Sequence, residues 1–230
     1  KIPYAASFAM FSAGRAFEQV RNSVGYPKLN VKVVGSHAGI SVGEDGATHQ
    51  CCEDIALMRT IPGMVILNPS DHYEMKAAVR AAIEHKGPCY IRLGRLAVES
   101  INNNDDYHFE LGKGILLREG TDITIVATGL MVSEAVKAAK ALEAEGISAE
   151  VINIHTIKPL DEEIILNSAK KTGRVVTVEE HNIIGGLGEA VAAVLSEKCP
   201  TPVTRIGVND VFGHSGPAVD LLKEFGLSAE

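Results

Sequence analysis

The residues from Ser36 to Gln50 combine several side chains that could do chemistry. Their sequence, SHAGISVGEDGATHQ, holds two histidines, two acids and three glycines. The imidazoles of His37 and His49 suit proton transfer or phosphate binding, while the Asp45 carboxylate can accept a hydrogen bond from a substrate hydroxyl. A sugar phosphate would need all three functions. A glycine-rich connection with solvated polar side chains is the alternative interpretation of each histidine.

The flanking patterns predict that this segment is a loop at the carboxyl end of a strand. Residues 31–34 are β-branched enough for a buried strand, and residues 52–60 have a helical pattern of apolar positions. Ligands bind at this edge in open α/β sheets, and glycine lets the backbone approach them closely. The spacing of His37 and His49 does not match H-x-x-x-H, which disfavours a structural metal site.

The motif at residues 43–50, GEDGATHQ, closely resembles the G-E-D-G-x-T-H-Q segment of transketolases. Two flanking stretches agree. The family's segment that binds the thiamine pyrimidine is similar to Ser7 to Phe11 followed by Arg15 to Arg21, and the similarity continues at Arg59 to Asp71. The resemblance covers essentially the whole chain. It is specific to thiamine diphosphate enzymes and favours transketolases split into two polypeptides, of which this chain resembles the carboxyl-terminal one.

The resemblance implies roles for four residues near the reacting atoms. Phe8 and Phe11 would contact the pyrimidine of thiamine diphosphate; packing in the core is the alternative for each. Asp45 would accept the C2 hydroxyl of the substrate. His49 would lie where protons move near the reacting carbons, and is the catalytic candidate.

The resemblance also implies that His37 and Arg95 bind the phosphate group of the substrate. Arg95 follows the expected strand at residues 89–93, and an arginine there can bind phosphate bidentately. Arg92 is near enough to take that role instead. A solvated surface side chain is the alternative for Arg95.

The resemblance implies that this chain is part of a transketolase, which transfers a two-carbon ketol unit between sugar phosphates, as in the pentose phosphate pathway. Thiamine diphosphate would be shared with an amino-terminal section or subunit, which would hold the pyrophosphate and its Mg or Ca ion; no metal ligand is expected in this chain. The Glu that activates the pyrimidine would lie before Lys1. We therefore expect an N-terminally truncated chain that is inactive when isolated and tends to form homo-oligomers.

Composition excludes several other classes. The chain has 230 residues, 46% of them hydrophobic, and a net charge of −7 without a basic stripe, so nucleic acid is not an expected ligand. No apolar run approaches the roughly 20 residues of a membrane-spanning helix. Four cysteines without regular spacing indicate a reducing compartment, and we expect a cytoplasmic protein.

The elements predict an α/β fold of two domains with mostly parallel sheets flanked by helices. Residues 1–108 would form a partial pyrimidine-binding domain and residues 109–230 the transketolase carboxyl-terminal domain, with a polar segment at Asn102 to Asp106 within the boundary region 97–112. The expected strands are 2–8, 31–34, 64–67, 89–93, 123–127, 150–154, 174–178 and 203–208. The expected helices are 16–24, 52–60, 72–84, 132–144, 161–171, 190–197 and one after residue 216. Ser70 or Asp71 is the expected cap of the helix at 72–84, and Asp161 that of the helix stopped by Gly173.

Other motifs in the chain do not indicate a different function. Gly185 to Gly188 lacks the G-x-G-x-x-G spacing of dinucleotide sites and indicates tight packing; with Glu179-Glu180-His181 it is similar to a part of transketolases that does not bind the cofactor. Gly213 to Pro217 does not match the hydrolase elbow. A deoxyxylulose-phosphate synthase, in which Glu44 is not expected, and a pyruvate dehydrogenase beta-type subunit, whose loop lacks the Gly-Glu-Asp-Gly run, are two alternatives. The sequence argues against both more than against a third, a non-catalytic assembly or regulatory subunit of the same fold.

Overall fold

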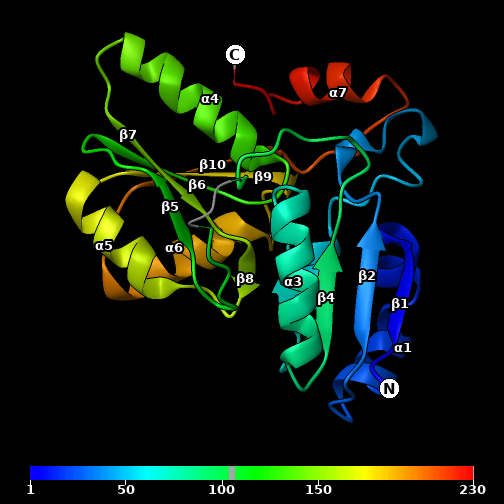
Figure 1. The fold of residues 1–230 in the computed structure, drawn as a ribbon. Coiled ribbons are helices and arrows are strands. Elements are labelled where there is room, and N and C mark those ends of the chain that lie inside the picture. Colours follow the sequence, from blue (N-terminus) through cyan, green and yellow to red (C-terminus); the bar gives the residue numbers. More distant parts are fainter. Residues whose placement is uncertain (104–106, 230) are drawn as a thin grey trace.

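The computed structural model describes residues 1–103 and 107–229, which form two five-stranded sheets flanked by helices (Figure 1). The first sheet contains β1 (Tyr4–Phe8), β2 (Lys32–Ser36), β4 (Cys89–Arg92), β3 (Val65–Leu67) and β8 (Thr156–Lys158), in that spatial order. The second sheet contains β10 (Val203–Val208), β9 (Val175–Asn182), β6 (Ile123–Ala127), β7 (Ala149–Asn153) and β5 (Ile115–Arg118). Six strand pairings are parallel, and only β3–β8 and β5–β7 are antiparallel among the described residues. The predicted fold class is confirmed.

Helical segments connect these strands. The α-helices are α1 (Phe17–Val20), α2 (Asp54–Arg59), α3 (His72–Glu84), α4 (Met131–Ala144), α5 (Glu162–Thr172), α6 (Leu187–Lys198) and α7 (Ala218–Glu224). The π-helical segments η1 (Met10–Arg15) and η2 (Arg21–Gly25) flank α1, and η3 (Ile40–Asp45) is a 3-10 segment. None of the helices in the described part of the chain has the length and apolar character needed to cross a membrane.

Local sequence signals explain where the best-predicted helices begin and end. The Asp71 side chain accepts the backbone N–H of Glu74 at 2.9 Å, and the Asp161 side chain accepts that of Ile164 at 3.3 Å. Both carboxylates satisfy amides that the first helical turn leaves unpaired. At the other end of α5, Gly173 takes a left-handed conformation with φ 70°. The predicted caps of α3 and α5 are therefore confirmed.

Alternating side chains on the buried strands divide the core into layers. On β6, Ile125 and Ala127 belong to the cluster that contains the apolar face of α4, whereas Val126 belongs to the cluster with α5 and α6. Figure 1 shows α4 and the α5–α6 pair on opposite faces of the second sheet. The cluster with Val126 also holds Val33 and Ile66 of the first sheet. The two halves of the chain thus share one apolar core.

Two strands were not predicted, and one of them joins the halves. β5 and β8 are short edge strands, and β8 comes from the second half but pairs antiparallel with β3, aligning Lys158 with Ile66. Short segments of this kind lack a clear periodicity, because their pairing is set by a distant partner. The division at residue 108 stays a prediction.

The boundary segment begins against the first half of the chain. Asp71 Oδ2 accepts the backbone N–H groups of Ile101 and Asn102, each at 2.8 Å, and Asn102 is 2% exposed. The hydroxyl of Tyr107 donates to Glu74 at 2.9 Å. The predicted polar residues Asn104, Asp105 and Asp106 lie outside the described residues.

Candidate active site

The parallel pairing of β1 and β2 brings the predicted site residues to one edge of the first sheet. In this register Phe8 lies beside Ser36, so the residue that ends β1 meets the start of the loop that follows β2. η1 with Phe11 continues from β1, and the loop after β2 carries His37 and His49. The site is therefore built at the carboxyl ends of parallel strands, where α/β sheets bind ligands.

Four of the predicted residues form an aromatic cluster. The rings of Phe8 and His37 are stacked, with centroids 4.0 Å apart and an interplanar angle of 6°. Phe11 lies 6.0 Å from Phe8, and His49 meets the Phe11 ring edge-on at 5.4 Å. The guanidinium of Arg15 lies over the ring of Phe11, 4.9 Å from the ring centroid. The cluster offers half-buried aromatic surface next to two imidazoles.

His37 has an unusual backbone conformation. Its φ of 54° lies in the left-handed region, which non-glycine residues rarely adopt. Its Nδ1 is 3.1 Å from the hydroxyl of Ser36, which fixes one ring nitrogen. Residues held in such conformations cluster at functional sites because the surrounding structure must stabilise them. This observation favours a functional role for His37 over a solvated loop residue.

Asp45 and Arg95 lie next to each other on the open side of the loop. Nη1 of Arg95 is 3.5 Å from Oδ2 of Asp45 and 3.4 Å from Oε2 of Glu44, and it also donates to the carbonyl of Val42. The Arg95 side chain is 40% exposed and that of Asp45 44%. The structure thus joins Arg95 to the acidic part of the predicted loop, with both groups open to a ligand.

Arg92 has a different environment from Arg95. Its side chain is 3% exposed; Nε donates to both oxygens of Asp54, at 3.1 and 2.9 Å, and Nη2 donates to the carbonyl of Glu180 at 2.8 Å. Asp54 also accepts the hydroxyl of Tyr90 at 2.8 Å. Arg92 is therefore committed to buried partners, and Arg95 is the arginine that a phosphate could reach.

The loop rests on the second half of the chain. Nε2 of Gln50 donates to the carbonyl of His214 in the second half at 3.0 Å, and to the carbonyl of Ile40 within the loop at 3.1 Å. Oε1 of Glu180 accepts the backbone N–H of Ser41 at 2.6 Å. Sequence reasoning did not identify these supports. The only signal in the sequence was the pair Glu179-Glu180, which lies near the end of β9 and before the Gly-rich turn.

Comparison with known proteins decides the family. The model of the transketolase pyrimidine binding domain matches residues 1–100, and that of the transketolase C-terminal domain matches residues 112–230. A Methanocaldococcus jannaschii protein provisionally named a transketolase C-terminal section is 55% identical over 232 residues, which cover 100% of this chain and 72% of that protein. The chain belongs to the transketolase family.

Two further relatives agree with this assignment. The 6-deoxy-6-sulfo-D-fructose transketolase subunit SqwH of Clostridium sp. is 50% identical, with 100% of this transketolase-family chain and 71% of that protein covered. The solved structure of a split gene transketolase, an inactive beta4 tetramer, superposes with a TM-score of 0.90 at 52% identity and covers 100% of this chain and 72% of that one. The predicted resemblance to the carboxyl-terminal section of a split transketolase is confirmed.

Enzymes of the transketolase family use thiamine diphosphate, and the aromatic cluster fits part of this cofactor. A flat aminopyrimidine can stack on aromatic rings, and Phe8 and Phe11 present half-buried rings at the end of the pyrimidine-domain strand β1. These two residues would hold the heterocycle. When bound, the cofactor would supply an electron sink that stabilises a carbanion. In the described part of the chain no three His, Cys, Asp or Glu side chains are grouped as metal ligands.

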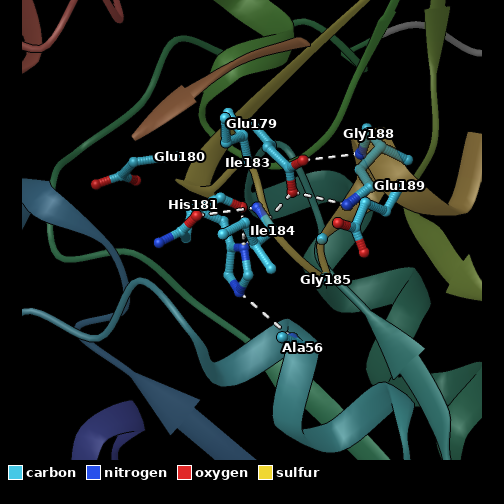
Figure 2. A network of polar contacts seen from close by, with 12 residues as sticks. Ala56, Glu179, Glu180, His181, Ile183, Ile184, Gly185, Gly188 and Glu189 are labelled. Carbon is cyan, nitrogen blue, oxygen red and sulfur yellow. Dashed lines mark hydrogen bonds and ion pairs between the residues drawn. The ribbon is translucent and has the colours of Figure 1, made fainter. Parts of the chain in front are cut away.

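The glycine-rich turn before α6 binds a carboxylate of the chain itself. Oε2 and Oε1 of Glu179 accept the backbone N–H groups of Leu187 and Gly188 at 2.7 and 2.8 Å (Figure 2). A Cβ on Gly186 would lie 1.9 Å from this carboxylate, so only glycine fits there. Burial raises the pKa of Glu179 to about 7. The turn is a packed helix start, in agreement with the tight-packing interpretation.

His181 links the end of β9 to α2 as a neutral side chain. Its Nδ1 lies 2.7 Å from the carbonyl of Asn182, and its Nε2 accepts the backbone N–H of Ala56 at 3.3 Å (Figure 2). This pattern places the single proton on Nδ1. Burial lowers the pKa of His181 to about 4, so the ring is uncharged at neutral pH. His181 is a structural residue that joins the two halves of the chain.

Proposed function

We propose that this chain is part of a thiamine diphosphate-dependent transketolase that transfers a two-carbon ketol unit between sugar phosphates. One observation carries the proposal: the loop after β2 packs His37 and His49 against Phe8 and Phe11, and the same loop presents Asp45 beside Arg95. Cofactor contacts and substrate contacts are thus neighbours at one sheet edge.

The residues take distinct roles in this proposal. Phe8 and Phe11 orient the pyrimidine, and His49, edge-on to the Phe11 ring, exchanges protons with the reacting substrate. Asp45 accepts the C2 hydroxyl of the sugar. His37 and Arg95 bind the anionic end, for which a guanidinium offers charge-assisted hydrogen bonds in a planar fork.

A partner completes the proposed enzyme. Relatives whose names describe a C-terminal section and a transketolase subunit support an amino-terminal section or subunit as that partner. That section would hold the pyrophosphate and its Mg or Ca ion, and the isolated chain would be inactive. β1 lies at the edge of the first sheet with mostly exposed residues, which favours pairing with another chain and supports a homo-oligomer. Four unpaired cysteines agree with a cytoplasmic enzyme of carbohydrate metabolism.

A sulfonated sugar is a second candidate substrate. The relative with 50% identity is named for 6-deoxy-6-sulfo-D-fructose, and a sulfonate, like a phosphate, presents several anionic oxygens to Arg95 and His37. The test compares xylulose 5-phosphate, a sulfonated ketose and pyruvate as donors for the full-length chain with its partner. Ketol transfer from the first two donors supports the proposal, and exclusive decarboxylation of pyruvate contradicts it.

A further inference from the structure

We propose that Glu180 is a positioning residue that holds the loop carrying His37, Asp45 and His49 in its substrate-binding conformation. This inference rests on the proposed function, because it assigns the loop to substrate. Glu180 belongs to β9 in the second half of the chain, whereas the loop belongs to the first half. The residue would therefore act on the reaction through the loop and not by touching the substrate.

The first support is a direct contact with the middle of the loop. Oε1 of Glu180 accepts the backbone N–H of Ser41 at 2.6 Å, and Glu180 is only 3% exposed. A short hydrogen bond from an amide to a carboxylate is stronger than one between neutral groups. Ser41 belongs to η3 and lies between His37 and Asp45 in the sequence, so this hydrogen bond anchors the backbone that connects the two residues.

The second support is the close fit between Glu180 and Gly39. Gly39 has φ 87°, and a Cβ added there would lie 2.3 Å from Oε1 of Glu180 and 2.4 Å from its carboxyl carbon. A side chain at this position would both strain the backbone and displace the carboxylate. The loop and Glu180 thus depend on each other for their positions.

The third support is that Glu180 is itself fixed. The backbone carbonyl of Glu180 accepts a hydrogen bond from Nη2 of Arg92, and Arg92 forms an ion pair with the buried carboxylate of Asp54. Arg92 lies at the end of β4, just before the segment with Arg95. Glu180 therefore contacts both the loop, through its side chain, and β4, which leads to Arg95, through its backbone carbonyl.

Glu179 provides a matched control for Glu180. It is the preceding residue, it is 1% exposed, and its carboxylate also accepts backbone N–H groups, but those of Leu187 and Gly188 in α6. Figure 2 shows the two carboxylates pointing away from each other, with Glu179 directed toward Gly188. Loss of Glu179 should weaken α6 without moving the loop.

The experiment uses the full-length chain with its partner and compares Glu180→Met, Glu180→Gln and Glu179→Met. Methionine has a similar length but no carboxylate oxygen, and glutamine keeps one acceptor. Two readouts are measured: hydrogen exchange of the Ser41 amide, which does not require activity, and kcat and KM for a phosphorylated donor. Gly39→Ala disturbs the same contact from the loop and serves if Glu180→Met does not fold.

We expect Glu180→Met to exchange the Ser41 amide at least about tenfold faster and to raise KM at least about tenfold, with Glu180→Gln restoring most of both. Glu179→Met should leave both readouts within about twofold. Unchanged exchange in Glu180→Met, or equal losses in the two methionine variants, would overturn the inference. If the wild type transfers no ketol group but Glu180→Met still frees the Ser41 amide, the proposed function fails while the role of Glu180 in holding the loop stands.

Discussion

Nη1 of Arg95 lies 3.5 Å from Oδ2 of Asp45, and both side chains remain about half exposed. Ion pairs in contact with water contribute little to stability, so neither group is locked to the other. A bound sugar phosphate could therefore take the guanidinium through its anionic end and the carboxylate through a hydroxyl. The pair brings together two recognition groups that the sequence places fifty residues apart.

The first prediction concerns Asp45. If its carboxylate accepts a buried substrate hydroxyl, Asp45→Ala should cost about 1.5–3 kcal/mol of transition-state binding, seen as a loss in kcat/KM. Discrimination between C2 epimers should fall in parallel, because the mutant no longer reads the hydroxyl. Glu44→Ala removes the neighbouring carboxylate, which also lies near Arg95, and is the control. Equal kinetics for Asp45→Ala and the wild type would remove Asp45 from the site.

The second prediction separates the two arginines. Arg95→Ala should raise KM for phosphorylated donors far more than for unphosphorylated ones, and His37→Gln should show the same selectivity. The effect of Arg95→Ala on the free energy of unfolding should stay below about 1 kcal/mol, because the ion pairs of Arg95 are exposed.

Arg92→Ala is the matched comparison for Arg95→Ala. It leaves the buried Asp54 carboxylate without its cation, which should cost about 3–5 kcal/mol in urea-induced unfolding. If Arg95→Ala lost phosphorylated and unphosphorylated donors equally, or if Arg92→Ala were as stable as Arg95→Ala, this assignment of the two arginines would be wrong.

The third prediction concerns pH and Glu179. Its pKa is raised from 4.5 to about 7 by burial, so between these values the folded state holds a proton that the unfolded state releases. The contribution of Glu179 to stability therefore falls as pH rises from about 4.5 through about 7. Glu179→Gln does not titrate. Relative to the wild type, the variant should thus gain stability between pH 5 and pH 8, by up to about 3 kcal/mol.

Urea unfolding of both proteins at the two pH values measures this effect. His181 has the opposite dependence, because its pKa is lowered to about 4 and its protonation costs stability as pH falls. Because Nδ1 of His181 lies 3.8 Å from Oε2 of Glu179, the same comparison is repeated with His181→Gln in both proteins, which isolates Glu179. A stability difference that is the same at pH 5 and pH 8 would show that Glu179 keeps an ordinary pKa in the fold.

Features that depend on neighbouring residues were predictable from the sequence. Asp71 and Asp161 act as the expected helix caps, because a cap needs only the next three residues. The sequence also indicated that His37 and His49 lie in a loop that follows a strand, but their stacking and edge-on contacts with Phe8 and Phe11 were not predicted. The family resemblance supplied their roles, which local physics alone left open.

Features that depend on distant partners were not predictable. β8 is a strand only because Lys158 and its neighbours pair with β3, far away in sequence. Asn102 belongs to a polar segment that predicts exposure, yet it is buried because Asp71 accepts its amide. The contact between Glu180 and Ser41 joins residues 139 positions apart, and no spacing in the sequence reports it.

The central claim is that this chain contributes the pyrimidine contacts and substrate contacts of a two-part transketolase. The most direct measurement is ketol transfer from xylulose 5-phosphate with thiamine diphosphate and magnesium, made on the isolated chain and on the full-length chain reconstituted with its amino-terminal partner. The account predicts no turnover by the isolated chain and turnover on reconstitution, abolished or strongly reduced by His49→Ala. Turnover by the isolated chain, or reconstituted activity unaffected by His49→Ala, would contradict it.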